Sequence, residues 1–156
     1  MRHTTRIACL LCLSWLAAPL FAATSSPVGT WNQVDDDSGK VTSVIRIAQQ
    51  DDGTLSGTVE KVMNMTPEQI ARDGQPPKCT QCDGERHNQP IEGMTIMWGL
   101  TAHGNSWDGG HIIDPASGKT YKVKLTPTDG GKKLKVRGYI GFSMLGRTQV
   151  WQRVSE

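Results

Sequence analysis

The sequence predicts an all-β protein: an eight-stranded antiparallel up-and-down barrel with one long loop that carries a short helix. Three observations support this prediction. Apolar and polar residues alternate in short segments, Gly, Asp, Asn and Pro separate those segments, and helical periodicity is nearly absent. At 156 residues, with 37% hydrophobic and 21% charged residues, the chain suits one globular domain and leaves no room for a second large core.

Residues 1–22 are typical of an export signal. Basic residues come first, an apolar run follows, and small residues end the segment near Ala22 and Ala23. We expect cleavage at that point, a mature domain over residues 23–156 without a transmembrane segment, and a periplasmic or secreted location.

Removal of the signal changes the charge balance. Arg2 and Arg6 account for two of the 17 basic residues, so the rest of the chain holds 15 basic and 15 acidic residues. A net charge of zero predicts neither a nucleic-acid partner nor a polybasic membrane patch.

Eight strands are expected after the signal. They are residues 28–34, 41–49, 53–64, 94–101, 105–114, 119–126, 132–140 and 146–154. The alternation is clearest where Tyr121, Val123 and Leu125 alternate with Lys122 and Lys124, which gives one dry and one wet face. Most connections are short, so neighbours in sequence should pair in an antiparallel meander, and closure into a barrel removes the exposed edges.

Residues 65–93 are the one long connection. Thr66 and Gln69 fit a capping box with proline at the first helical position, which predicts a short helix near 67–72. A loop of this length in a compact domain is usually functional or disordered. We expect it to roof the open end of the barrel.

Cys79 and Cys82 are the cysteines that remain after the signal, and they lie in this insert. In an oxidising compartment they are expected to form a disulfide that shapes the loop and stabilises the fold by about 2 kcal/mol. Two alternatives stay open. One is a redox-active dithiol, although the sequence lacks the helix N-terminus such a site uses. The other is a soft-metal site suited to Cu(I), with His87 and the methionines at 63, 65, 94 and 97 as further ligands.

An eight-stranded barrel is either filled by side chains or holds one small ligand. We expect a small amphipathic or apolar ligand, with candidate binding residues Trp31, Trp98, Trp107, Arg137 and Tyr139. The strand alternation places Arg137 at the rim. No nucleophile, base and acid occur at a suggestive spacing, so we expect no enzyme, no metal and no cofactor. The alternative is a filled scaffold that contacts a partner around Arg137 to Arg147.

Two resemblances refine this view. Gly29-Thr30-Trp31 resembles the Gly-x-Trp signature of lipocalin and calycin barrels. The resemblance implies that Trp31 closes one end of the barrel while Arg153 or Arg147 packs over its ring, a contact worth roughly 0.5 to 2 kcal/mol.

Four blocks in order also resemble a bacterial exported family known as domain-of-unknown-function family 2147. The blocks are Val28-Gly29-Thr30-Trp31, Pro90-Ile91-Glu92-Gly93-Met94, Trp107 to Tyr121, and Arg137 to Trp151. They imply a lipocalin-like barrel in the bacterial envelope or exported from it, with no established reaction.

Overall fold

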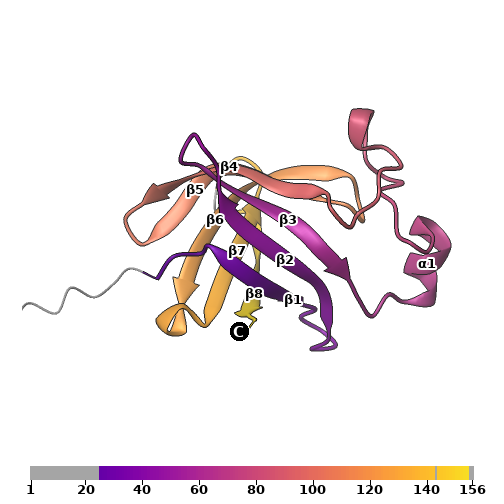
Figure 1. Ribbon diagram of the computed structural model, residues 1–156, viewed down its shortest axis with the longest axis horizontal. Coiled ribbons are helices and arrows are strands. Elements are labelled where there is room, and N and C mark those ends of the chain that lie inside the picture. The colour runs from indigo at the N-terminus through magenta and orange to yellow at the C-terminus, as the bar shows by residue number, and fades with distance from the viewer. Residues whose placement is uncertain (1–24, 143, 155–156) are drawn as a thin grey trace, which may run out of the picture.

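The computed structural model describes residues 25–142 and 144–154, which form a closed barrel of eight antiparallel strands (Figure 1). Each strand pairs with the next along the chain, and the last returns to the first. The strands are β1 (Gly29–Val34), β2 (Val41–Gln49), β3 (Leu55–Val62), β4 (Thr95–His103), β5 (Ser106–Asp114), β6 (Lys119–Thr128), β7 (Lys133–Tyr139) and β8 (Gly146–Arg153). The predicted fold class is confirmed, and every expected strand is present. The predicted export signal lies outside the described residues.

The seam between β1 and β8 is short. It pairs Trp31 with Arg153 and Asn32 with Gln152. One further bond extends it, in which the Val154 amide donates to the Thr30 carbonyl at 2.9 Å. Closure of the barrel therefore depends on few backbone hydrogen bonds and on the side chains packed between β1 and β8.

The inward faces of the strands supply most of the core, as the alternation predicts. On β6 and β7, Val123, Leu125 and Leu134 are fully buried, while the lysines between them point outward. The largest fully buried side chains are Trp31, Trp151, Ile45, Ile47, Met97, Leu100, Leu125 and Leu134.

The two ends of the barrel differ in their connections. The β2–β3, β4–β5 and β6–β7 turns and residues 25–28 lie at one end, near Trp31, and we call this the closed end. The β1–β2, β5–β6 and β7–β8 turns and the insert between β3 and β4 lie at the other, the open end. Figure 1 shows the insert and its helix projecting beyond β3 and β4.

The insert contains α1 (Pro67–Asp73) and the 3-10 turn η1 (Gly84–Arg86). The predicted capping box is present: the Gln69 amide donates to Thr66 Oγ1 at 3.3 Å, and the Thr66 amide donates to Gln69 Oε1 at 2.7 Å. A second 3-10 turn, η2 (Asp129–Gly131), precedes β7. Within the part of the chain that the structure describes, no helix has the length and apolar character needed to cross a membrane.

Charge is not spread evenly over the outer surface. The β6–β7 register sets Lys122 opposite Tyr139 and Lys124 opposite Arg137. Residues directly opposite each other share a face, and Lys133 and Lys135 have the same parity on β7 as Arg137. Five cations therefore lie on the outer face of two neighbouring strands. We call this surface the basic face; it consists of Lys122, Lys124, Lys133, Lys135 and Arg137. The expectation of no polybasic patch was therefore wrong, because a zero net charge does not report how strand register sorts the charges.

Candidate ligand-binding site

A cavity of about 580 Å³ opens at the open end of the barrel. Trp151 and Val136 are buried and line its inner part, while Tyr121 stands on its wall. Ile140 and Leu145, from the β7–β8 connection, extend the lining toward the mouth. The volume lies in the range that holds a small organic ligand, so the barrel is filled toward its closed end and hollow toward its open end.

A chain of hydrogen bonds places one polar group on the cavity wall. Trp151 Nε1 donates to Gln149 Oε1 at 3.3 Å, and Gln33 Nε2 donates to the same oxygen at 3.1 Å. Ser43 Oγ donates to Gln33 Oε1 at 2.9 Å. An indole N–H can only donate, so it fixes which amide atom of Gln149 faces it. Gln149 Nε2 then has no protein partner within residues 25–142 and 144–154, and this cavity-lining amide is available to a ligand acceptor.

The rim carries charge of both signs. Arg147 Nη2 donates to Asp36 Oδ2 at 3.0 Å, and this contact raises the pKa of Arg147. The Ser38 side chain donates to Asp35 at 2.7 Å and lowers the pKa of that carboxyl. Asp114, which also lines the cavity, accepts from the Ala116 amide at 3.0 Å. The mouth is thus polar around an interior that is mainly apolar and aromatic.

The structure separates the predicted binding residues. Trp31, Trp98, Trp107 and Arg137 are not among the residues that line the cavity. Tyr139 borders the cavity, but it has the outward parity of Arg137 on β7. Trp107 packs half-buried against the core near the closed end. Arg137 lies on the outer face of β7, where it donates to Thr148 Oγ1 at 2.8 Å and to the Met144 carbonyl at 3.1 Å.

Trp98 points out of the barrel because β4 changes its alternation at Gly99. This glycine has φ of +72°, and the register with β3 shifts nearby, so that Met97 and Leu100 are both fully buried. Trp98 then stacks on His111 with ring centroids 5.9 Å apart, and the Arg86 guanidinium lies 4.7 Å from the Trp98 ring. This outer stack holds η1 against β4 and β5.

At the closed end, the Arg153 guanidinium lies 4.2 Å from the centre of the Trp31 ring. Arg153 also donates to the carbonyl oxygens of Gly131, Val28 and Ser26 at 2.6, 2.9 and 2.7 Å. Trp31 is fully buried, and its Nε1 donates to Pro27 O at 2.7 Å. Of the two arginines expected over this ring, only Arg153 is there; Arg147 lies at the opposite end, on the cavity rim.

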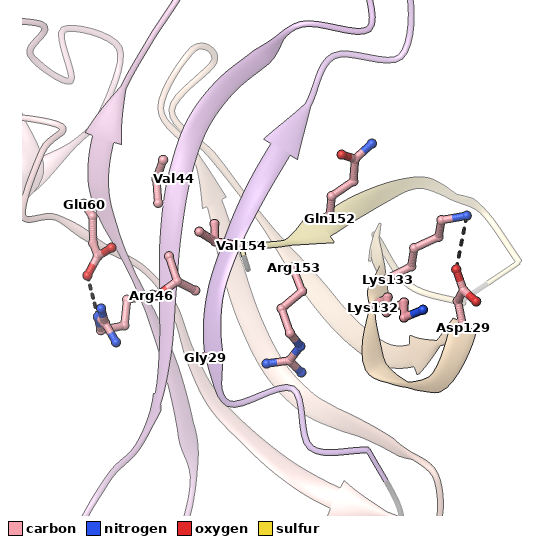
Figure 2. A pocket seen from close by; sticks show the side chains of 11 residues that line it. Gly29, Val44, Arg46, Glu60, Asp129, Lys132, Lys133, Gln152, Arg153 and Val154 are labelled. Carbon is pink, nitrogen blue, oxygen red and sulfur yellow. Dashed lines mark hydrogen bonds and ion pairs between the residues drawn. The ribbon is translucent and has the colours of Figure 1, made fainter. Parts of the chain in front are cut away.

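A second groove, of about 1160 Å³, follows the outer surface near the seam (Figure 2). Arg46 pairs with Glu60, and Lys133 Nζ lies 3.5 Å from Asp129 Oδ2. The guanidinium of Arg153 is occupied as described above. Three of the cations along the groove therefore already have partners, and we assign no ligand to it.

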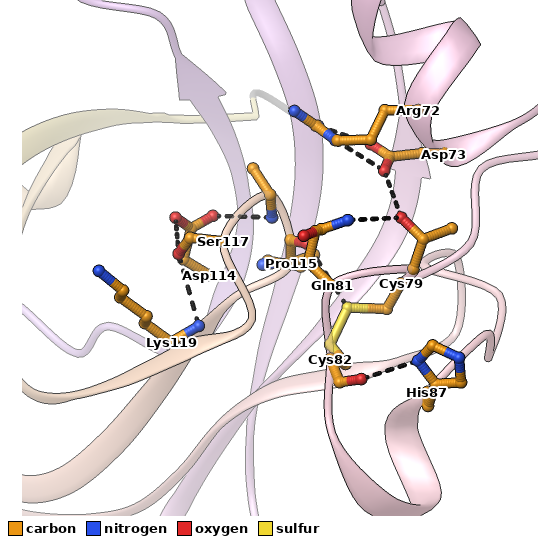
Figure 3. The surroundings of a disulfide bond; sticks show 12 residues. Arg72, Asp73, Cys79, Gln81, Cys82, His87, Asp114, Pro115, Ser117 and Lys119 are labelled. Carbon is orange, nitrogen blue, oxygen red and sulfur yellow. Dashed lines mark hydrogen bonds and ion pairs between the residues drawn. A yellow bond between two sulfur atoms is a disulfide. The ribbon is translucent and has the colours of Figure 1, made fainter.

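The predicted disulfide between Cys79 and Cys82 is confirmed, and both residues are almost completely buried (Figure 3). His87 Nδ1 lies 2.9 Å from the Cys82 carbonyl oxygen, and Cys79 Sγ lies 3.6 Å from that of Pro115 in the β5–β6 turn. A Cβ atom added at Gly118 would come within 1.9 Å of the Gln81 carbonyl oxygen. The disulfide loop is therefore seated directly on the β5–β6 turn.

A partly buried salt bridge, in which the Asp73 carboxylate is buried and Arg72 is exposed, holds the other side of this loop. Arg72 donates two hydrogen bonds to the Asp73 carboxylate, at 2.8 and 2.6 Å, and Thr80 Oγ1 donates a third at 3.1 Å. The bonds from Arg72 are the main reason that the pKa of Asp73 is lowered. No residue of the insert lines the cavity, so the expectation that it roofs the open end was wrong; it flanks the mouth at the β5–β6 turn.

The soft-metal alternative required free thiolates at Cys79 and Cys82, but here the two sulfur atoms are bonded to each other. Of the methionines considered as ligands, Met94 and Met97 are buried in the hydrophobic core. Within residues 25–142 and 144–154, no group of three or more His, Cys, Asp or Glu side chains could hold a metal ion.

Sequence reasoning missed the polar wall of the cavity. Gln33 follows Trp31 by two residues and Gln149 precedes Trp151 by two, so each shares the inward face of a buried tryptophan. The two-residue spacing between each glutamine and a tryptophan could therefore have predicted that both glutamines point into the barrel.

The comparisons agree with this architecture. A family model described as "Uncharacterized protein conserved in bacteria (DUF2147)" matches residues 29–153. Protein HP1028 from the human pathogen Helicobacter pylori, described as belonging to the lipocalin family, is similar in structure with a TM-score of 0.68 and 17% sequence identity, over 84% of each chain. No curated protein matches the chain. At this identity the likeness shows the fold alone, which is a lipocalin-like barrel.

Proposed function

Because the chain belongs to the bacterial family DUF2147 and folds as a lipocalin-like barrel, we propose that it is an exported, non-catalytic binding protein for a small amphipathic ligand. The observation that carries the proposal is the 580 Å³ cavity with apolar and aromatic walls and one free amide donor. Sites of this kind bind an apolar body by burial and fix its orientation with a few polar groups.

The polar groups favour a neutral ligand that carries a hydrogen-bond acceptor. Gln149 Nε2 offers a donor inside the cavity, whereas the cation at the rim, Arg147, is already paired with Asp36. Asp35 and Asp114 add negative charge near the mouth. An ester or ketone on a hydrocarbon body therefore suits the site better than a fatty-acid anion.

A substitution at Gly138 can narrow the cavity without changing the strand pairing of the barrel. It lies on the β7 wall, and a Cβ atom there would make ordinary contacts of 3.8 Å with Tyr121 and 3.9 Å with Ile112. Gly138→Leu should therefore reduce the cavity volume, because the longer side chain projects into space now empty. Val150→Leu is the matched control, since Val150 lies exposed on the outer face of neighbouring β8.

The test is titration with the neutral fluorescent probe N-phenyl-1-naphthylamine, followed by displacement with a long-chain methyl ester. Wild type and Val150→Leu should bind the probe at one site, and Gly138→Leu should bind it more weakly. Gln149→Leu should reduce the affinity for the ester by about three- to tenfold, the range expected for one hydrogen bond, and should leave the affinity for an alkane of equal length unchanged. Equal probe binding by Gly138→Leu and wild type would contradict the proposal.

A further inference from the structure

The β7–β8 connection exposes an unusual amount of apolar surface. Ile140, Phe142, Met144 and Leu145 are 65%, 81%, 87% and 73% exposed. We call these four residues the apolar tip. Single exposed apolar residues are common on soluble proteins, but four in one six-residue connection form a patch of the kind that contacts another apolar phase.

The apolar tip is joined to the basic face by the same two strands. Lys122 is paired with Tyr139, one residue before Ile140, and Arg137 lies three residues before Ile140. At a rise of about 3.4 Å per residue, both cations lie within about 10 Å of the tip along β7, which is close to one Debye length at physiological salt. Arg137 also binds the Met144 carbonyl, which ties the tip to the basic face.

The charges on this face are only partly neutralised. Lys124 lies 3.9 Å from Asp108, and Lys133 lies 3.5 Å from Asp129. Within the described ranges 25–142 and 144–154, Lys122 and Lys135 form no ion pair with an acidic side chain. An apolar end bordered by uncompensated lysines is complementary to a surface whose outer layer is anionic and whose interior is hydrocarbon.

We propose that the apolar tip and the adjoining basic face form a docking surface for an anionic phospholipid bilayer. The tip enters the acyl boundary, while Lys122 and Arg137 meet the phosphate groups. The acidic turn of residues 35–37 belongs to the same end but adjoins the β1–β8 seam, on the other side of the hairpin. An anionic surface therefore draws the β6–β7 side toward it and turns the β1–β2 side away.

The position of the docking surface is also suited to loading the cavity. Ile140 and Leu145 belong both to the apolar tip and to the cavity lining, so apolar surface is continuous from the tip into the barrel. Transfer of a ligand from the bilayer along this path rests on the proposed function, whereas docking itself does not.

The test is co-flotation of the full chain with vesicles of phosphatidylcholine alone or with added phosphatidylglycerol. Phe142→Ser/Met144→Ser should bind the anionic vesicles at least about tenfold more weakly than wild type, because two side chains no longer enter the acyl layer. The matched control is Ile70→Ser, an exposed apolar residue on α1. Wild type and variants share residues 1–24, so any contribution from that segment is common to all of them.

A second variant tests whether the basic face contributes to vesicle binding. Lys122→Gln/Lys135→Gln should weaken binding to anionic vesicles several-fold and reduce its salt dependence, with no effect on neutral vesicles. Lys61→Gln/Lys78→Gln, which removes two exposed lysines of β3 and the insert, should bind as wild type does. Phe142→Trp provides a direct readout, since brominated lipids should quench its added fluorescence.

Three outcomes would overturn the proposal: wild type that binds no vesicles, a tip variant that binds as well as wild type, or a wild-type dimer that the tip variant converts to a monomer without any vesicle binding. The last result would assign the tip to a second copy of the chain. Phe142 and Met144 do not line the cavity, so the tip variant should still bind the naphthylamine probe. Vesicle docking without probe binding would reject the proposed ligand function and leave the docking surface intact.

Discussion

The two ends of the barrel contain similar residue types, but these are packed at the closed end and accessible at the open end. At the closed end, Trp31 is fully buried, its N–H has a partner, and Arg153 covers its ring while binding three carbonyl groups. At the open end, Tyr121 faces a cavity, Gln149 keeps an unused donor, and the connection beyond β7 exposes apolar side chains. Aromatic side chains stabilise the fold at the closed end, whereas at the open end they line a cavity that a ligand can occupy.

The difference follows from how many polar atoms are satisfied within the chain. A buried polar atom without a partner costs stability, and at the closed end the fully buried Trp31 donates its N–H to the Pro27 carbonyl. The open end contains a cavity, so its polar atoms can be satisfied by a ligand instead of by the chain. Stability and binding should therefore be separable by substitution at the two ends.

The largest expected effect is loss of stability at the closed end. Trp31→Ala should lower the free energy of unfolding by about 3–5 kcal/mol, because it leaves a large void and removes the ring that Arg153 covers. Tyr121→Ala, at the mouth, should lower it by about 1 kcal/mol or less, because the side chain is only partly buried. Urea denaturation measures both values.

The two alanine variants should rank in the reverse order when probe binding is measured instead of stability. Tyr121→Ala should weaken binding of the naphthylamine probe, because Tyr121 lines the cavity. Trp31→Ala, in the range where it stays folded, should bind the probe as wild type does. Similar losses of stability from the two variants would mean that the ends are not energetically distinct.

A second prediction concerns the seat of the insert beside the mouth. Gly118 and Gly39 have φ of +70° and +68°, so alanine is strained by about 1–2 kcal/mol at either position. At Gly118 the new Cβ also meets Gln81, whereas at Gly39 it meets nothing within 4 Å. Gly118→Ala should therefore cost about 1–3 kcal/mol more than Gly39→Ala, since the disulfide loop must move.

Amide hydrogen exchange should locate that difference. Gly118→Ala should speed exchange at Cys79 and Cys82, whose amides bond within the insert, and leave the strands at the closed end unchanged. Equal stability of the two alanine variants would show that the insert does not depend on this contact.

The alternation of residues was sufficient to predict the strands and their inward faces, because a half-buried strand imposes a period of two on the sequence. It failed where backbone geometry interrupts that period. Gly99 resets the alternation in β4 and turns Trp98 outward, and Ile140, on the inward parity of β7, lies beyond the end of the strand and is exposed.

The cavity was harder to predict, since an internal volume depends on which residues meet in one layer across several strands. Strand register alone could have predicted which of Arg147 and Arg153 covers the Trp31 ring. They share a face of β8 but lie six residues apart, which is about 20 Å along a strand. Both could not cover the same ring, and once Trp31 is paired with Arg153 the other arginine must lie toward the opposite end.

The smallest expected effect is acid-dependent and confined to the insert. The pKa of Asp73 is lowered from the ordinary value of 3.8, chiefly by hydrogen bonds from Arg72. A carboxyl whose folded pKa is depressed contributes stability that is complete above its unfolded pKa and is lost as pH falls through the folded value. Asp73→Asn should therefore cost about 1 kcal/mol at pH 7, and its stability should converge with that of wild type as pH falls below 3.8.

Asp52 provides the matched comparison at the closed end. Its pKa is also lowered, by hydrogen bonds from the Thr54 amide and hydroxyl, but it lies exposed in the β2–β3 turn. Water competes for the same oxygen atoms there, so Asp52→Asn should change the pH dependence of unfolding less than Asp73→Asn does. Denaturation of the three proteins at pH 7, 5 and 3 measures this, and an equal effect of the two substitutions would show that burial of Asp73 adds nothing to the anchoring of the insert.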